Sequence, residues 1–431
     1  MRARGRSAAN ASERTCAGTC GCGGRRRCAA SGADAIRFWP VDRKPTPHTN
    51  RLAVVLTGGG ARAAYQVGVL RTIANRFPGT RFNIITGVSA GAINALFLAS
   101  RQTPLPETIG DLTKLWEDLR IESVIHVAPW SLARQLSLWA LRLVSGGSSL
   151  SPNVRGLVDT APLRELLART FPHHEGGVIS GVAENVARCE PDAVAITTLN
   201  YTTGQTITWV DGCEIETWAR PLRRATRTAF TIDHVMASAA LPILFPAVRL
   251  GDSWHGDGGI RLIAPLSPAL HLGAERILAI STSYQQTFDE AERHETVGYP
   301  PPAQILGQLM SSVFLDVMDE DALHLERSNA FLRELPPELR RGYRIVDLVV
   351  VRPSRDLSAL AAHYEPLLPR GFRFLTRSLG TRETSRPHFL SLLMFERNYL
   401  REMMDIGAAA AEARLDDIAR LLKTPVTNVA A

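Results

Sequence analysis

Apolar residues near the start of the ordered chain fall into short runs separated by glycine-rich turns. Residues 52–56 are apolar and β-branched, and the run stops at Thr57 and three glycines, a pattern that predicts a buried strand. The spacing predicts a helix over 61–76, which ends at a Pro-Gly turn, and a second strand over 82–86. This order predicts a βαβ unit with two parallel strands.

The second strand is followed at once by an apolar helix over 90–100, so Ser89 is expected on a sharp turn between strand and helix. From Pro104 the pattern is helical to about Val144. The later patterns predict a Gly/Ser linker over 145–151, a capped helix over 159–170, a hairpin over 193–200 and 205–210, core strands over 276–281 and 346–351, and helices over 304–332 and 389–422. This alternation of helices and strands favours an α/β layered sheet.

The first 50 residues differ from the rest of the chain. They are rich in Gly, Arg, Ala and Ser without periodicity, so we predict a disordered tail. They hold ten basic and three acidic residues, which accounts for the whole net charge of +7. The remaining chain is balanced, so the basic pI gives no reason to expect a nucleic-acid partner. The spacing of four tail cysteines could suit zinc and the arginines could suit targeting, although neither matches an established pattern: Cys16, Cys20, Cys22 and Cys28.

The body of the chain offers no segment long enough to span a bilayer. The best candidate, 130–144, is broken by Arg134 and Arg142 and falls short of the ~18 apolar residues that a spanning helix needs. Its apolar residues have helical spacing, which suits core packing or peripheral membrane contact: Leu132, Leu136, Trp139 and Leu143. Cys189 and Cys213 are too few for a disulfide scaffold, so we expect a reducing, cytoplasmic compartment.

Ester cleavage needs an exposed nucleophile, a proton acceptor, and hydrogen-bond donors for the developing oxyanion. Ser89 is the candidate nucleophile, because small residues on both sides, including Gly87 and Gly91, permit a strained turn. The candidate donors are the backbone amides of three glycines between a strand and a helix, Gly58, Gly59 and Gly60. In a parallel βαβ unit both segments lie at the carboxyl ends of neighbouring strands, so they are expected to face each other.

Asp257 is the candidate base. It is followed by Gly258 and Gly259, and glycines on both sides let its carboxylate approach another loop closely. A carboxylate is a weak base, but it can accept the serine proton when a partly dry pocket raises its proton affinity. Taken alone, each of these motifs is more commonly an ordinary tight turn.

Together and in this order, the motifs GGGAR (58–62), GVSAG (87–91) and DGG (257–259) resemble the patatin-like phospholipases. The resemblance extends to Asn94 and to residues 159–163 and 237–246, and covers roughly residues 51–285. It implies a three-layer α/β/α sandwich with a mainly parallel sheet, and a phospholipase A or lysophospholipase type of activity on a lipid ester. It also implies a Ser89 and Asp257 dyad without histidine, an acyl-enzyme intermediate and an oxyanion hole in the glycine loop.

Several further expectations follow from this resemblance. No metal and no organic cofactor is expected. Ala63 stands where the family usually has a last loop glycine, which should be tolerated if the residue has helical dihedrals. Arg62 matches the family's basic position and is expected to orient the loop. The predicted domains are a tail over 1–50, a catalytic domain over 51–285 and a helical extension over 286–431 that packs on it.

Three alternatives stay open. The spacing of Gly58, Gly60 and Ala63 also fits a dinucleotide-binding loop, but no acidic residue lies between Asp42 and Glu107 to hold a ribose. An α/β-hydrolase would use a histidine after Asp257, for which His271, His363 and His388 are available, although that fold tends to place several strands before its nucleophile. A noncatalytic, membrane-associated protein could also keep the fold.

Overall fold

The computed structural model describes residues 50–126, 134, 137, 138, 140, 141, 144, 156–174, 176–292, 298–314, 317–378, 380–384 and 386–423. All of them belong to one unit, Pro45–Ala431. Residues 1–49 of the predicted tail with its four cysteines and the linker over 145–151 lie outside the described residues, and so do the four apolar residues singled out for helical spacing, Leu132, Leu136, Trp139 and Leu143.

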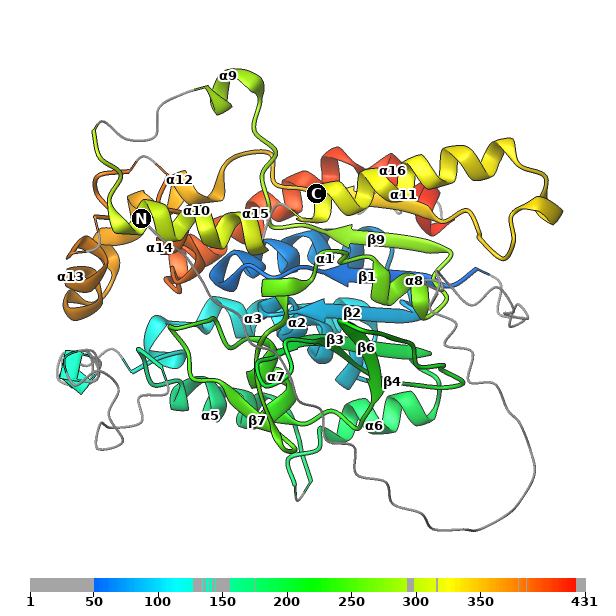
Figure 1. Ribbon diagram of the computed structural model, residues 1–431. Helices are drawn as coiled ribbons and strands as arrows, with labels where there is room; N and C mark the ends of the chain where they lie inside the picture. The colour runs from blue at the N-terminus through cyan, green and yellow to red at the C-terminus, as the bar shows by residue number, and fades with distance from the viewer. Residues whose placement is uncertain are drawn as a thin grey trace, which may run out of the picture. The chain divides into compact units, whose positions relative to one another are not determined.

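A single sheet lies at the centre of this unit (Figure 1). Its order is β10-β9-β1-β2-β3-β4-β6-β5, with β8 paired to β3 and β7 paired to β8. Neighbours from β10 to β3 pair in parallel, whereas β3 pairs antiparallel with both β4 and β8. The predicted mainly parallel α/β sheet is therefore confirmed. The strands are β1 (Leu52–Leu56), β2 (Ile84–Val88), β3 (Ala193–Asn200), β4 (Thr206–Gly212), β5 (Ala219–Arg220), β6 (Arg223–Arg227), β7 (Val248–Leu250), β8 (Ser253–Asp257), β9 (Arg276–Ile280) and β10 (Asp347–Val351).

Helices surround this sheet. The α-helices are α1 (Ala64–Arg76), α2 (Ala90–Ser100), α3 (Leu105–Asp118), α5 (Ala161–Thr170), α6 (Ser180–Ala187), α7 (Ile232–Ser238), α8 (Ser267–His271), α9 (Phe288–Ala291), α10 (Pro302–Phe314), α11 (Val317–Glu334), α12 (Leu357–Tyr364), α13 (Arg370–Ser378), α14 (His388–Leu392), α15 (Arg397–Ala413) and α16 (Leu415–Leu422). Short 3-10 turns are η1 (Gly60–Ala63), η2 (Ile121–Ser123), η3 (Gly258–Arg261), η4 (Pro337–Leu339) and η5 (Glu365–Leu367).

The strand β1 shows how the sheet separates two apolar layers. Leu52, Val54 and Leu56 belong to the larger core cluster with side chains of α1, α2 and α15. The alternate residues Ala53 and Val55 belong to a second cluster with side chains of α8 and α11. Because successive strand residues point to opposite faces, helices cover both faces of the sheet and the architecture has three layers.

The helices α1 and α15 pack closely, although they come from opposite ends of the chain. A Cβ atom at Gly68 would lie 1.8 Å from the carbonyl oxygen of Met404, and one at Gly407 would lie 2.1 Å from that of Tyr65. Only glycine permits this approach of two backbones. The first helix of the βαβ unit is therefore fixed against a C-terminal helix.

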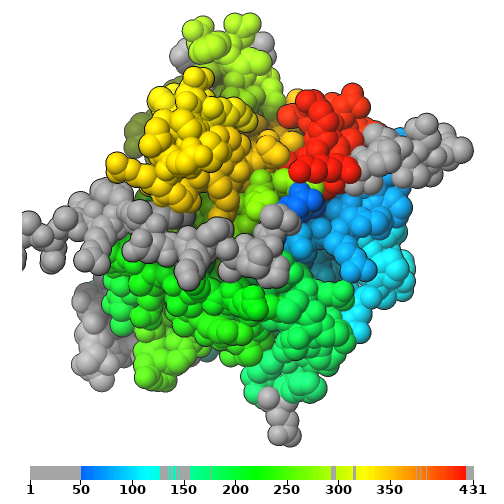
Figure 2. Space-filling view, turned by 90° about the vertical axis from the view of Figure 1, so that its right-hand side faces the viewer, coloured from blue at the N-terminus to red at the C-terminus, as the bar shows by residue number. Residues whose placement is uncertain are grey.

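The C-terminal residues also complete the sheet. The strand predicted over 346–351 is confirmed as β10, which pairs in parallel with β9. The end of α16 lies beside the start of β1, in Figure 2 the red and blue segments, and Lys423 Nζ donates to Asn50 Oδ1 at 3.2 Å. The domain boundary at residue 285 stays a prediction.

Two helix predictions were too long. The helix expected from Pro104 to about Val144 ends at Asp118, because Leu119 turns to extended backbone and buries its side chain. The helix expected over 389–422 is three helices, since the carboxylate of Glu396 accepts from the amides of Asn398 and Tyr399 and begins α15 afresh. Among the described helices, none combines the length and the apolar character that a bilayer span requires.

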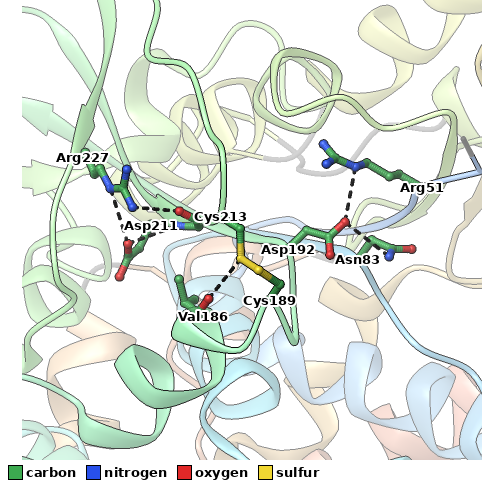
Figure 3. The surroundings of a disulfide bond; sticks show 9 residues. Arg51, Asn83, Val186, Cys189, Asp192, Asp211, Cys213 and Arg227 are labelled. Carbon is green, nitrogen blue, oxygen red and sulfur yellow. Dashed lines mark hydrogen bonds and ion pairs between the residues drawn. A yellow bond between two sulfur atoms is a disulfide. The ribbon is translucent and has the colours of Figure 1, made fainter. Parts of the chain in front are cut away.

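The two body cysteines are bonded to each other (Figure 3). The bond joins Cys189, just after α6, to Cys213, just after β4, with Cα atoms 5.6 Å apart. The sequence suggested too few cysteines for a disulfide framework and a reducing compartment. The single cross-link ties the end of a helix to a sheet strand and forms no larger framework, and the compartment stays a prediction.

Candidate active site

Ser89 lies on the turn between β2 and α2, as the sequence predicted. Its backbone has φ 56° and ψ −132°, a conformation that costs energy for any residue except glycine. The amide of Ser89 donates to Ser238 Oγ at 3.0 Å, and that hydroxyl donates to the Thr197 carbonyl at 2.8 Å. A neighbouring helix and strand therefore hold the strained turn in place.

The flanking glycines are required by close backbone contacts. A Cβ atom at Gly91 would lie 2.4 Å from the carbonyl oxygens at the end of β1, and one at Gly87 would lie 2.4 Å from the Gly91 carbonyl oxygen. Both overlaps are with backbone, which cannot rotate away. The tight packing of the serine turn on β1 thus depends on these two residues.

The glycine loop lies beside the serine. A Cβ atom at Gly58 would be 3.1 Å from the Cβ of Ser89, and Gly59 and Gly60 have φ 148° and 55°. Thr282 Oγ1 donates to the Gly58 carbonyl at 2.6 Å. Because the N–H of a trans peptide points opposite to its carbonyl, this bond fixes the direction of the Gly59 amide.

Buried amide side chains connect the loop to the helix after the serine. Gln66 Nε2 donates to the Thr57 carbonyl at 2.7 Å, and Asn94 Nδ2 donates to Gln66 Oε1 at 2.9 Å. Trp116 Nε1 in turn donates to Asn94 Oδ1 at 2.8 Å. Ala63 has φ −66° and ψ −11°, so the helical dihedrals expected for it are confirmed.

Arg62 joins the glycine loop to the C-terminal part of the chain. Its side chain is 3 % exposed and donates to Ser391 Oγ at 2.8 and 2.6 Å and to Ser358 Oγ at 2.9 Å. Its guanidinium also lies 3.4 Å from Nδ1 of His388. Burial, with the charge of Arg62 second, lowers the pKa of His388 to about 4. The ring is therefore neutral at physiological pH.

Asp257 ends β8 with its side chain fully buried. Its amide donates to the Ala240 carbonyl at 2.9 Å, and its Oδ1 accepts from the Gly259 amide at 2.8 Å. Within the described residues, Oδ2 has no partner at hydrogen-bond distance. Burial raises the pKa of Asp257 to about 7, and the Ser89 hydroxyl and the Gly259 amide oppose the rise.

The Ser89 hydroxyl opposes the rise in the pKa of Asp257, although the carboxylate oxygen Oδ2 has no partner with hydrogen-bond geometry among the described residues. Such loosely aligned contacts are common where substrate is absent and tighten in the reacting complex. The arrangement therefore brings a proton acceptor close to Ser89 without an intervening imidazole.

The glycines around Asp257 are also enclosed. A Cβ atom at Gly258 would lie 2.3 Å from the Thr197 carbonyl oxygen, and one at Gly256 would lie 2.2 Å from the Tyr201 hydroxyl. Burial, followed by the charge of Asp257, raises the pKa of Tyr201 to about 12. Tyr201 is thus a neutral phenol near the carboxyl.

A narrow apolar pocket opens at Ser89, and we call it the Ser89 pocket. Gly60 and Ser89 both line it. The remaining lining contains no charged side chain and no histidine among the described residues: Ala90, Ile93, Leu115, Trp116, Leu119, Val124, Leu163, Leu166, Leu167, Thr170, Ala239, Leu241, Phe245, Leu392, Leu393 and Phe395. Such a lining suits a hydrocarbon chain, since each buried methylene contributes about 0.8 kcal/mol.

The three histidines considered from sequence occupy other environments. His271 stacks on Trp218 with ring centroids 4.4 Å apart, His363 is exposed, and His388 lies against Arg62 and Ser358. Among the described residues, no cluster of three or more His, Cys, Asp or Glu side chains could hold a metal ion.

The sequence motifs did not reveal the residues that hold the site together. Ser238 lies in a block that carried the family resemblance, but its bond to the Ser89 amide has no sequence signature. Thr282 and Ser391 lie 224 and 329 positions from their partners in the glycine loop. A single-sequence pattern does not report such long-range contacts, whereas the fold does.

The mainly parallel sheet, with Ser89 on a sharp turn at the carboxyl end of β2, defines an α/β fold with a strand-turn-helix serine motif. Its residues 54–270, about half of the chain, match the family model described as patatin-like phospholipase, and the chain belongs to that family.

One similar relative is a cGAMP-activated phospholipase of Pseudomonas aeruginosa, 28% identical over 230 residues. The match covers 53% of this chain and 56% of the relative, so the chain spans about half the length of that protein. Similar solved structures include human GIVD cytosolic phospholipase A2 bound to methyl gamma-linolenyl fluorophosphonate (12% identity, TM-score 0.40, 86% and 59% of the two chains). Another is VipD from Legionella pneumophila (15%, 0.30, 70% and 61%). At these scores the structural likeness is loose, and the family assignment rests on the sequence match.

Proposed function

We propose that this protein is a lipid acyl hydrolase of the phospholipase A or lysophospholipase type. The observation that carries the proposal is the position of Ser89, which lines an apolar pocket beside the glycine loop. A fatty acyl chain in this pocket brings its ester carbonyl to the serine. The family membership and the name of the Pseudomonas relative support the same class of reaction.

In the proposed reaction the Ser89 oxygen bonds to the ester carbonyl carbon while Asp257 takes the hydroxyl proton. The tetrahedral intermediate expels the alcohol, which receives that proton, and an acyl-enzyme remains. Asp257 then takes a proton from water, whose oxygen attacks the acyl carbon. The fatty acid leaves and the proton returns to Ser89.

Amides of Gly58, Gly59 and Gly60 are the proposed donors to the oxyanion. Donors of this kind are worth about 3 kcal/mol each in the transition state. The positive φ values at Gly59 and Gly60 support this role, because they turn successive peptide groups into a concave arrangement. Arg62 supports it indirectly by holding the loop to α14.

The raised pKa of Asp257 supports its role as the base. A carboxyl with a pKa of about 7 is ionised above neutrality yet far more basic than an ordinary aspartate. The full burial of its side chain is the cause of this raised proton affinity.

Covalent labelling tests this proposal. A fluorophosphonate probe should label the wild-type protein and the Ser328→Ala variant, and Ser89→Ala should abolish labelling; Ser328 is an exposed serine of α11. The Ser89→Ala variant should also lose fatty acid release from phosphatidylcholine and lysophosphatidylcholine, whereas Ser328→Ala should keep it. Labelling that persists in Ser89→Ala, or a folded wild type that is not labelled, would reject the assignment and favour a noncatalytic protein.

We also infer that the enzyme meets its substrate at a membrane surface. The helix α13 has the sequence RGFRFLTRS, in which Phe374 is 75% exposed between arginines. Phe374→Glu should reduce sedimentation with anionic liposomes, and Leu339→Glu, at an exposed leucine of η4, should not. Equal binding by both variants would exclude α13 as the contact.

A further inference from the structure

A second apolar pocket lies next to the Ser89 pocket, between α10, α13 and α14, and we call it the α10–α14 pocket. Apart from one threonine, its lining is entirely apolar: Leu157, Val158, Leu241, Pro242, Ile243, Leu244, Leu306, Met310, Phe372, Thr376, Phe389, Leu392 and Leu393. The hydroxyl of Thr376 is directed to the Arg373 carbonyl at 3.1 Å. The lining therefore offers no free polar group to a head group and suits hydrocarbon.

The two pockets share a wall made of Leu241, Leu392 and Leu393. All three side chains are buried, with at most 8% exposed. One wall residue, Leu241, directly follows Ala240, whose carbonyl accepts from the amide of Asp257. On the other side, a Cβ atom at Gly60 would lie 2.2 Å from the Leu392 carbonyl oxygen. The wall is thus attached to both the proposed base and the oxyanion loop.

The lining of the α10–α14 pocket includes a strained residue. Ile243 has φ 67°, a conformation rare for β-branched side chains, and its side chain is 65% exposed. The Ile243 carbonyl accepts from the Leu157 amide at 3.1 Å, which helps to hold this turn. Strain of this kind persists where the surrounding structure enforces it, often at ligand sites.

We propose that the α10–α14 pocket binds a second hydrocarbon chain of the substrate, so that the enzyme selects two-chain glycerolipids over single-chain esters. This inference rests on the proposed function. One acyl chain enters the Ser89 pocket with its ester at the serine, and the other chain of the same molecule passes to the opposite side of the shared wall. A single chain occupies one side of the wall only, so the second pocket indicates a second chain.

Burial of one methylene strengthens binding about fourfold. A bulky side chain that displaces two methylenes from the α10–α14 pocket should therefore weaken binding of a two-chain lipid by a factor of about ten or more. The same side chain should leave a single-chain lipid unaffected. Met310→Trp fills this pocket from α10. Leu309→Trp is the matched control, because Leu309 lies on the same helix, is 56% exposed and does not line the pocket.

Calorimetric titration of the full chain carrying Ser89→Ala measures binding without turnover. The probes are dioctanoyl phosphatidylcholine and octanoyl lysophosphatidylcholine, each below its micelle concentration. We expect tighter binding of the two-chain lipid, a loss of about tenfold or more of that affinity in Met310→Trp, and no change in Leu309→Trp. Unchanged two-chain affinity in Met310→Trp, or an equal loss for both lipids, would overturn the proposal.

A second variant guards against misfolding. Leu306→Trp fills the α10–α14 pocket from another turn of α10 and should repeat the result, with melting temperatures checked for each variant. Hydrolysis of p-nitrophenyl butyrate by the wild type reports separately on the proposed function. If the wild type does not hydrolyse this ester but the Ser89→Ala protein still binds the two-chain lipid more tightly, only the proposed function is refuted. If the wild type hydrolyses the ester but neither Met310→Trp nor Leu306→Trp weakens binding of the two-chain lipid, only the second chain site is refuted.

Discussion

The two regions that meet at Ser89 are built in different ways. Residues 52–100 contain the serine turn and the glycine loop, and they form a βαβα segment whose elements follow one another directly along the chain. The segment 388–395 contributes α14 and two of the three residues of the wall between the two pockets, and it contacts Arg62 across more than 300 positions. The first region places Ser89 and the glycine loop, β8 places Asp257, and the 388–395 segment lines and supports the space around them.

This difference separates chemistry from support. A substitution at the reacting groups should remove turnover and leave folding intact or improve it. A substitution in the contacts between the two regions should lower turnover and stability together. The following variants are ordered by their expected effect on turnover.

Asp257→Asn should have the largest effect. The amide cannot accept the serine proton, so kcat should fall by a factor of about 10³. At pH 8 its melting temperature should rise. Folding raises the pKa of Asp257 from 3.8 to about 7, so the folded state holds this proton more tightly than the unfolded chain. The stability that Asp257 costs is therefore lost progressively as the pH rises from 3.8 to about 7, is fully lost above about 7, and is regained below 3.8.

Activity assays and thermal melts on Asp257→Asn check both parts. A variant with more than about a tenth of wild-type kcat would show that Asp257 is not the base. A lower melting temperature at pH 8 would show that its carboxylate serves folding instead.

Arg62→Met tests the brace between the two regions. The variant leaves Ser391 and Ser358 without a buried charged partner, so the free energy of unfolding should fall by about 3 kcal/mol. As the glycine loop loosens, kcat should fall by a factor of about 10². Arg71→Met is the matched control on α1, since its exposed ion pair with Asp405 contributes less than about 1 kcal/mol. Equal denaturation midpoints for both variants would mean that Arg62 does not stabilise the contact between the two regions.

Gly60→Ala tests the same contact from the backbone. Its φ is 55°, and an added Cβ would meet the Leu392 carbonyl oxygen at 2.2 Å, so stability should fall by about 2 kcal/mol and kcat by a factor of about ten. Gly79→Ala is the control, because nothing lies within 4 Å of its Cβ position. It should be neutral or slightly stabilising. If kcat of Gly60→Ala equals that of the wild type, Gly60 does not contribute to oxyanion stabilisation.

The disulfide should have the smallest effect on turnover. It closes a loop of 24 residues, so replacing Cys189 and Cys213 by alanine should lower the free energy of unfolding by about 3 kcal/mol. Neither cysteine lines the Ser89 pocket, so kcat should not change. Urea titration and ester hydrolysis measure the two quantities, and a fall in kcat at a temperature where the variant is folded would contradict this separation.

The sequence predicted much of the first region. Short apolar runs bounded by glycine reported β1, β2 and the helices between and after them, because these contacts are local and periodic. The pattern also predicted the hairpin of β3 and β4 and the core strands β9 and β10. The strand β8, which ends at Asp257, has no clear alternation and was not predicted.

The second region could be predicted only in outline. Helical patterns over 389–422 were evident, but the capping carboxylate of Glu396 divides them, and nothing in the pattern placed α14 against the glycine loop. The pairing of Cys189 with Cys213 and the bond from Ser238 to Ser89 likewise depend on which strands become neighbours. Such contacts follow from the complete topology.

The central claim is that Asp257 activates Ser89 without a histidine. Its most direct test is the pH dependence of kcat/KM for a soluble ester from about pH 5 to about pH 9. The wild type should gain activity as Asp257 ionises near pH 7, level off above it, and keep this profile in His271→Ala, His363→Ala and His388→Gln. Asp257→Asn should lose the inflection. An inflection that survives in Asp257→Asn, or one that any histidine variant removes, would contradict the account.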